Sequence, residues 1–341
     1  MRCTNNKRTA YKRRQQRRRK RQAKTAAVLI VLLLLISAGA GAGFYMWDQS
    51  RNYTAEYEKS VYNKELYQGT LFAQNLCVTS QEVTLDGFQP DSSLHAAGLF
   101  DLGQEEVVCG YQIFDRLYPA STTKVMTAYL ALKYGNLDDV VTVSAHATDF
   151  NWDESVAGLL AGDTLTLYDL VCGLMICSGN DCGTAIAEHI SGSEEAFAEL
   201  MNKEAAELGA TGTHFVNPHG LHDENHYTTA YDLYLIFNAA VKDQRFLDII
   251  SMDSYSTDIM RADGTVNVVW EPTNYYSAGL ATPPEGVRVL GGKTGTTDQA
   301  GNCVILYDET AEGSPYISVI MGASDKTILY DQMNQLFTAG M

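Results

Sequence analysis

Three short motifs in a fixed order constrain this chain more than any other feature of its sequence. They are Ser121-Thr-Thr-Lys124, Ser178-Gly-Asn180 and Lys293-Thr-Gly295. Each motif is weak when taken alone, because serine, lysine and glycine are common residues. Together they supply a hydroxyl nucleophile, a nearby amine base, a second hydroxyl and a second cation, which are the parts of an acyl-transfer site. A fold that uses them has to bring three distant segments to one point.

The first motif is predicted to lie in the first turn of a helix. Pro119 precedes it, and Val125 and Leu130 continue the segment with helical spacing. Free N–H groups and the positive end of the helix dipole favour an anion that develops beside Ser121. Lys124 returns to the same face one turn later, and it can take the serine proton if burial or another cation lowers its pKa.

The second motif is predicted to lie between two helices. A capping box of Thr166 and Asp169 begins the apolar helix before it, and a second helical stretch follows. Gly179 permits a tight bend, so that Ser178 and Asn180 can both face a cleft.

The third motif is predicted to follow a strand over residues 287–292 whose glycines lie at the cleft end. Lys293 is the candidate second cation, and Gly295 would let the backbone approach a ligand closely. Each motif also has an ordinary structural interpretation, namely an exposed helix, a self-bonded turn and a glycine-rich strand end. Only their combination favours chemistry.

With these motifs, the chain resembles the serine D-alanyl-D-alanine carboxypeptidases, the low-molecular-mass penicillin-binding proteins of peptidase family S11. The likeness runs from about Leu71 to the C-terminus and extends beyond the motifs. Further matching segments are Asn217-Pro-His-Gly-Leu221, Thr273-Asn274, Gly291-Gly292 and Ala300-Gly-Asn-Cys303.

The resemblance implies a role for each catalytic residue. Ser121 would attack the carbonyl between the two terminal D-alanines of a peptidoglycan stem peptide, and Lys124 would act as the base. Ser178 would relay the proton to the leaving D-alanine. Asn180 would orient Lys124 and the substrate amide, and Lys293 would set the local potential. Penicillin would acylate the same serine.

The resemblance also implies the substrate-binding residues. Thr294 and Thr296, on either side of Gly295, would help to hold the terminal carboxylate. The backbone N–H groups of Ser121 and Thr296 would form the oxyanion hole, in which each donor is typically worth about 3–4 kcal/mol. His219 matches a family position near the cleft. Neither a cofactor nor a metal ion is implied.

The expected fold is of the α+β class. A hairpin is predicted over residues 94–113, helices dominate from 166 to about 240, and strands return near 287–292, 302–307 and 316–321 before a last helix from about 326. Strands at both ends with helices between them imply one sheet with a helical region across a cleft. The resemblance implies a five-stranded antiparallel sheet flanked by helices, with an inserted all-helical subdomain and the active site at the seam.

The N-terminal region predicts that the chain is inserted in a membrane. Residues 1–24 contain 12 of the 25 Lys and Arg residues and no acid, and residues 25–47 are uncharged and long enough to span a bilayer. This order predicts a cytoplasmic tail, a transmembrane signal anchor and an extracytoplasmic chain. A cleavable signal peptide is the alternative, because small residues follow Ser37. Residues 48–70 are expected to form a stalk and residues 71–341 the catalytic domain.

The charge balance argues against a nucleic-acid partner. After Lys24 the chain keeps 13 basic and all 41 acidic residues, so the exported part has no basic patch. The basic head stands directly before the apolar span, which is typical of a topology signal that also attracts anionic lipid.

Cysteine and histidine add little chemistry. The spacing of Cys172, Cys177 and Cys182 matches no zinc pattern, and most cysteines are expected to be small buried apolar residues. The order His-Asp-Glu-Asn-His over 222–226 differs from the metalloprotease motif His-Glu-x-x-His. A solvated loop beside the cleft is expected there, without a metal.

Two alternatives remain open. A β-lactamase shares all three motifs, but the class A enzymes add Glu-x-x-Leu-Asn, which is absent between Ser178 and Lys293. A non-catalytic penicillin-binding or scaffold protein is the other alternative. The presence of every reactive residue argues against it.

Overall fold

The computed structural model describes residues 75–341 together with isolated residues between 17 and 37. By their contacts, Ala73–Met341 form one compact unit, separate from Met1–Phe72. The predicted stalk, and most of the predicted tail over 1–24 and span over 25–47, lie outside the described residues. Among the residues that are described, no helix combines the length and the apolar character needed to cross a membrane.

A five-stranded antiparallel sheet forms the centre of the unit, as predicted. Its order is β2-β1-β9-β8-β7, so its neighbours come from both ends of the unit. The strands are β1 (Ala96–Asp101), β2 (Glu106–Tyr111), β7 (Val287–Thr297), β8 (Gly301–Thr310) and β9 (Pro315–Ala323).

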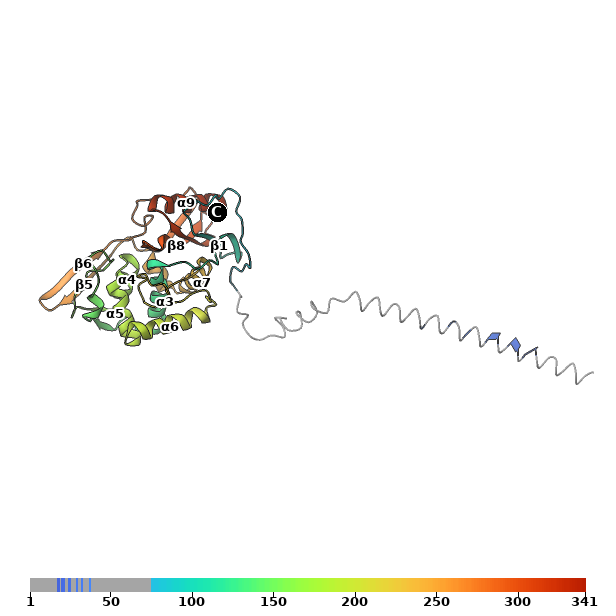
Figure 1. Ribbon diagram of the computed structural model, residues 1–341, viewed down its shortest axis with the longest axis horizontal. Coiled ribbons are helices and arrows are strands. Elements are labelled where there is room, and N and C mark those ends of the chain that lie inside the picture. Colours follow the sequence, from blue (N-terminus) through green and yellow to red (C-terminus); the bar gives the residue numbers. More distant parts are fainter. Residues whose placement is uncertain are drawn as a thin grey trace, which may run out of the picture. The chain divides into compact units, whose positions relative to one another are not determined.

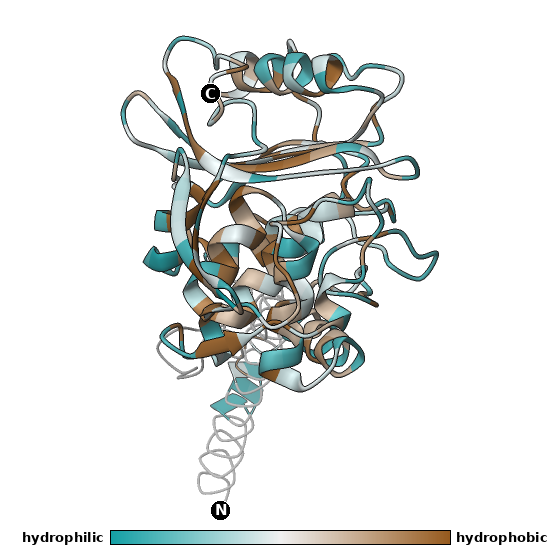
Figure 2. Cartoon of the chain, turned by 90° about the vertical axis from the view of Figure 1, so that its left-hand side faces the viewer, coloured by the Kyte–Doolittle hydropathy of each residue, from teal (hydrophilic) through white to brown (hydrophobic). Residues whose placement is uncertain are grey.

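Helices cover both faces of this sheet (Figure 2). Adjacent residues of one strand point to opposite faces, so Val319 packs with the large helical layer and Ile320 packs beneath the C-terminal helix. The helices are η1 (Ala120–Thr123), α3 (Lys124–Tyr134), η2 (His146–Thr148), α4 (Leu167–Ile176), α5 (Asn180–Ser191), α6 (Glu194–Glu207), α7 (Ala230–Ala240), α8 (Gln244–Ile250) and α9 (Lys326–Gly340).

The predicted all-helical subdomain is wrong, because the helical region carries a second sheet. Its four strands, in the order β3-β4-β5-β6, are β3 (Val140–Thr142), β4 (Thr164–Thr166), β5 (Tyr255–Arg261) and β6 (Gly264–Trp270). The first two are three residues long, too short to show an alternating pattern. The β5–β6 hairpin projects from the body of the unit (Figure 1). Its Asp263-Gly264 turn is a hairpin signal that could have predicted it.

The strand predicted over 287–292 is too short. β7 continues to Thr297, and Lys293–Thr297 pair with Gly301–Ile305 of β8. The glycines do not end the strand, because they serve packing instead: a Cβ on Gly291 would lie 2.0 Å from the carbonyl oxygen of Ile250. The third motif is therefore part of an edge strand.

Candidate active site

The amine of Lys124 lies at the centre of the site. Ser121 is on the 3-10 turn η1 and Lys124 begins α3, so the two side chains meet as predicted. The Lys124 Nζ atom lies 2.9 Å from Ser121 Oγ, 2.7 Å from Asn180 Oδ1 and 2.7 Å from the carbonyl oxygen of His219. Two of these three neighbours are carbonyl oxygens, which only accept hydrogen bonds.

A neutral amine can satisfy these three neighbours, as can an ammonium group. A neutral amine has two N–H groups for the two carbonyls and one lone pair for the Ser121 hydroxyl proton. Burial, and next the charge of Lys293, lowers the pKa of Lys124 well below its usual range. Burial also lowers the pKa of Lys293 to about 7. The surroundings therefore poise Lys124 to accept a proton from Ser121.

The second motif connects α4 to α5, as predicted. The capping box of Thr166 and Asp169 is present at the start of α4. The bend itself is made differently from the prediction, because Ser178 has the left-handed φ of 63° while Gly179 is extended. Gly179 is instead required by crowding, since a Cβ there would lie 2.8 Å from Ala157 Cβ.

The third motif brings the second cation to this connection. Lys293 Nζ donates hydrogen bonds to Ser178 Oγ at 3.0 Å and to the carbonyl oxygen of Thr294 at 2.8 Å. Both lysine side chains are almost fully buried. The motif residues thus meet between the edge strand β7 and the helical layer, which is the predicted seam.

The side chains of Thr294 and Thr296 on β7 form hydrogen bonds with neighbouring residues. Thr294 Oγ1 lies 2.8 Å from Thr273 Oγ1, and Thr296 Oγ1 donates to Asn302 Oδ1 at 3.1 Å. Gly295 faces the turn η1, here called the nucleophile turn after its candidate nucleophile Ser121, because a Cβ on Gly295 would lie 2.8 Å from the backbone nitrogen of Ser121. Its lack of a side chain admits the protein's own backbone, whereas the sequence predicted close approach of a ligand.

This geometry agrees with the family to which the sequence points. Residues 87–325 match peptidase family S11, described as D-alanyl-D-alanine carboxypeptidase. The chain belongs to this family. All three motifs lie within the matched residues. The match covers most of the compact unit Ala73–Met341.

Two curated carboxypeptidases illustrate the likeness. D-alanyl-D-alanine carboxypeptidase DacA of Haemophilus influenzae is 31% identical over 252 residues, which are 72% of this chain and 61% of that protein. DacF of Bacillus subtilis is 35% identical over 215 residues, 62% of this chain and 52% of that protein. The chain therefore spans roughly half to two thirds of the length of these relatives.

Solved structures show the same fold. The Streptomyces K15 DD-transpeptidase is 25% identical with a TM-score of 0.67, covering 74% of this chain and 98% of its own. A D-alanyl-D-alanine carboxypeptidase from Mycobacterium tuberculosis is 27% identical with a TM-score of 0.66, covering 76% of this chain and 96% of its own.

His219, predicted to bind substrate in this carboxypeptidase-family chain, contacts Lys124 through its backbone. Its carbonyl oxygen accepts from Lys124 Nζ. The ring is buried, lies 3.6 Å from Glu194 Oε1 and packs edge-on against Phe150. Burial lowers the pKa of His219 below its usual value. The structure thus places the residue next to the amine of Lys124.

The prediction of a solvated histidine loop is only partly right. His222 is exposed, but His226 is buried against the nucleophile turn. His226 Nδ1 accepts from the Val216 N–H at 3.1 Å, and Nε2 lies 2.8 Å from Thr123 Oγ1. These partners are distant in sequence, so a local pattern of polar residues could not reveal them. The contact also identifies a supporting residue that the motifs did not.

The cysteines follow the prediction of small buried residues. Cys77, Cys109, Cys172, Cys182 and Cys303 are free and buried, and Cys177 is half-buried. Within residues 75–341, no group of three or more His, Cys, Asp or Glu side chains has an arrangement that could hold a metal ion.

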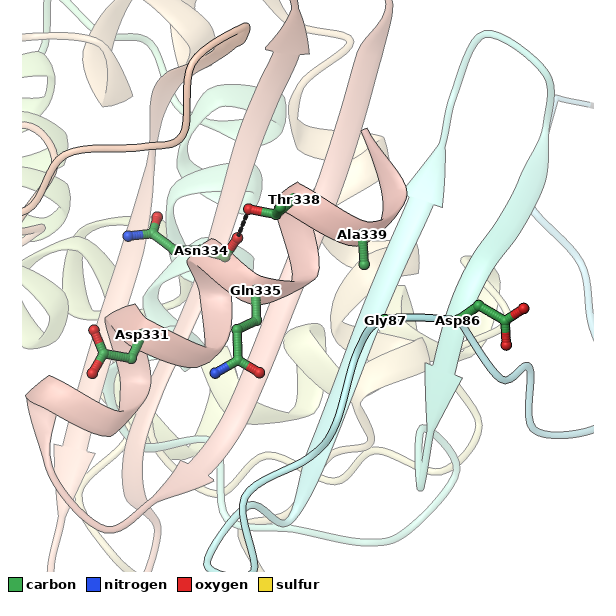
Figure 3. Close-up of a pocket in the computed structure, with 7 residues that line it drawn as sticks. All are labelled: Asp86, Gly87, Asp331, Asn334, Gln335, Thr338 and Ala339. Atoms are coloured by element: carbon green, nitrogen blue, oxygen red, sulfur yellow. Dashed lines mark hydrogen bonds between the residues drawn. The ribbon is translucent and has the colours of Figure 1, made fainter.

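A separate hollow lies away from these motifs. It measures about 620 Å³ and lies between α9 and the loop at Asp86 and Gly87, next to Asp331 and Gln335 (Figure 3). None of the predicted site residues lines it. The hollow is on the side of the sheet that α9 covers, whereas Ser121 and Lys124 belong to the helical layer on the other side.

Proposed function

We propose that this chain is a serine D,D-carboxypeptidase that removes the terminal D-alanine from peptidoglycan stem pentapeptides. The observation that carries the proposal is the environment of Lys124, a buried amine within hydrogen-bond distance of Ser121 Oγ and of two carbonyl oxygens. The family and the names of the curated relatives support the substrate class.

In the proposed acylation, Ser121 Oγ attacks the carbonyl carbon of the D-alanyl-D-alanine bond while its proton passes to Lys124 Nζ. The backbone N–H groups of Ser121 and Thr296 stabilise the oxyanion. The intermediate then expels D-alanine, whose amine receives a proton through Ser178. The hydrogen bond that Lys293 donates to Ser178 supports this role.

In the proposed deacylation, water attacks the ester on Ser121, and the shortened peptide leaves. Lys293 holds positive charge beside Ser178, and Thr294 and Thr296 bind the terminal carboxylate of the substrate. Penicillin acylates Ser121 by the same route. The chain has no Glu-x-x-Leu-Asn segment between Ser178 and Lys293, so the penicilloyl ester is expected to persist.

The test is D-alanine release from a muramyl pentapeptide by the full-length chain and by its Ser121→Ala variant. We expect release by the wild type and none above background by the variant, with Ser251→Ala, an exposed serine after α8, as the matched control. Equal release by wild type and Ser121→Ala would overturn the mechanism. Rapid turnover of penicillin would favour a β-lactamase, and a wild type that forms no covalent penicillin adduct would favour a scaffold.

We also propose that residues 25–47 anchor the catalytic domain, 71–341, outside the cytoplasmic membrane through the stalk 48–70, with residues 1–24 in the cytoplasm. The basic head before an uncharged span supports this topology. Mass spectrometry of the N-terminus and membrane fractionation test it. A soluble exported protein that begins near residue 40 would show instead that the segment is a cleaved signal peptide.

A further inference from the structure

Asp181 carries a buried carboxylate that the proposed mechanism does not use. It is the second residue of α5, and only 1% of it is exposed. Its Oδ1 atom accepts from the Ala157 N–H at 2.8 Å and from its own neighbour Cys182 at 2.9 Å, and Oδ2 accepts from the Leu159 N–H at 3.0 Å. The carboxylate thus joins the loop over 155–159 to the start of α5.

This loop in turn contacts Asn180. The carbonyl oxygen of Ser155 accepts from the Asn180 N–H at 2.8 Å. The β5–β6 hairpin holds the loop from its other side: Trp270 Nε1 donates to the Ala157 carbonyl at 3.0 Å, and Arg261 donates to the Gly158 carbonyl at 2.9 Å. The residue that contacts Lys124, Asn180, is therefore held by a loop with several hydrogen bonds, and Asp181 closes that loop.

The charge of Asp181 also acts on the catalytic amine. Lys124 faces a second cation, Lys293, which lowers its pKa, whereas Asp181 raises it. Burial raises the pKa of Asp181 itself, and hydrogen bonds from four backbone N–H groups, at Ala157–Leu159 and Cys182, oppose this effect. Both carboxylate oxygens accept N–H groups, an arrangement that a proton on either oxygen would disturb.

The other titratable groups around Lys124 do not supply this charge. Burial raises the pKa of Cys177 to about 12 and that of Cys182 well above its usual value, so both thiols stay protonated. Burial lowers the pKa of His219, so its ring is neutral at physiological pH. Asp181 is the carboxylate that raises the pKa of Lys124 most.

We propose that Asp181 is a positioning residue for acylation: its carboxylate closes the 155–159 loop over Asn180 and supplies the negative charge that offsets the two buried lysines. This inference rests on the proposed function, because it assigns Lys124 as the base. Under this proposal Asp181 has two separable effects, one on the position of Asn180 and one on the charge around Lys124.

The experiment compares Asp181→Asn with Asp163→Asn in the full-length chain. Asp163 is a matched control, since it is also buried and holds the end of the same loop by accepting from the Leu160 N–H at 2.8 Å and from Arg261 at 3.2 Å. Its charge is not among the causes of the Lys124 pKa shift. The measurements are the rate of covalent labelling by fluorescent penicillin as a function of pH, and the melting temperature.

We expect Asp181→Asn to slow labelling by about 10-fold or more, because misplacing a catalytic group can cost up to about 100-fold. We also expect the acid limb of its pH–rate profile to move to lower pH, because Lys124 loses a favourable neighbour and releases its proton more easily. Asp163→Asn should leave the acid limb in place. A purely structural role for Asp181 would slow labelling without moving the limb.

The outcomes separate this inference from the proposed function. A wild type that neither labels nor releases D-alanine contradicts the function itself. If the wild type is active but the acid limb of the Asp181→Asn profile stays in place or moves to higher pH, the inference is overturned. The proposed function is then unaffected. If Asp181→Asn does not fold, Asp181→Ser replaces it. Failure of both to fold while Asp163→Asn folds would assign Asp181 to the fold rather than to positioning.

Discussion

Gly295 lies so close to Ser121 that no other residue fits: a Cβ on Gly295 would lie 2.8 Å from the Ser121 backbone nitrogen. The edge strand β7 and the nucleophile turn η1 therefore touch through their backbones. Lys293 lies two residues before Gly295 on the same strand, and its charge acts on Lys124. The third motif thus acts as a spacer as well as a source of charge.

A Gly295→Ala variant tests this contact. We expect the new methyl group to push β7 away from η1, since backbone atoms of Ser121 and Thr122 lie within 3.0 Å of it. Labelling by fluorescent penicillin should fall by about 100-fold, in line with the loss of one oxyanion donor. Gly103→Ala, in the β1–β2 turn at the opposite edge, should keep its labelling rate. A Gly295→Ala protein that labels like the wild type would contradict the contact.

A Lys293→Met variant tests the coupling of the two lysines. Lys293 lowers the pKa of Lys124 by like-charge repulsion, so its removal lets that pKa rise. Less Lys124 is then neutral at a given pH, and the acid limb of the labelling profile should move to higher pH. This shift is opposite in sign to the one expected for Asp181→Asn. A limb that stays in place would mean that the two amines titrate independently.

The stability of the protein should depend on pH through His226. Burial lowers the pKa of His226 from 6.5 to about 3. Between these values the unfolded state binds a proton that the folded state does not, so stability is complete above about pH 6.5 and is lost as the pH falls toward 3. The loss approaches about 1.4 kcal/mol per pH unit for a full proton.

Thermal unfolding of His226→Gln at several pH values measures this effect. The variant loses hydrogen bonds and should melt at a lower temperature at neutral pH, but its melting temperature should fall less steeply on acidification. His222→Gln, in which an exposed ring is replaced, should keep the wild-type slope. If the melting temperatures of wild type and His226→Gln fall in parallel as the pH is lowered, His226 is not the source of the pH dependence.

The backbone at Ala120 is the fourth test. Ala120 has φ of 48°, a left-handed conformation that costs a non-glycine residue roughly 1 kcal/mol. Ala120→Gly should therefore keep or slightly raise the melting temperature, whereas Ala128→Gly, inside α3, should lower it.

Gly220→Ala should prevent the turn from forming, since its Cβ would lie 1.9 Å from the Ala120 carbonyl oxygen. A stable Gly220→Ala protein with normal labelling would contradict this packing.

Local sequence signals predicted the elements whose causes are local. Thr166 and Asp169 begin α4 through their own side chains, and Asp325 caps α9. β1, β8 and β9 are short and mainly apolar runs, as expected for strands that are buried on both faces of a sheet. Short strands such as β3 and the length of β7 were missed, because their partners and their glycine contacts come from distant segments.

The sequence by itself determined which chemical groups are available and in which order: the serine, the two lysines and the amide of Asn180. Only the tertiary structure decided what surrounds those groups. It placed two carbonyl oxygens and one hydroxyl around Lys124 and buried Lys293 beside Ser178. The pKa of an amine depends on desolvation and on nearby charges, which no spacing along the chain specifies. The same reason explains why the contacts of Asp181 and His226 could not be predicted from the sequence.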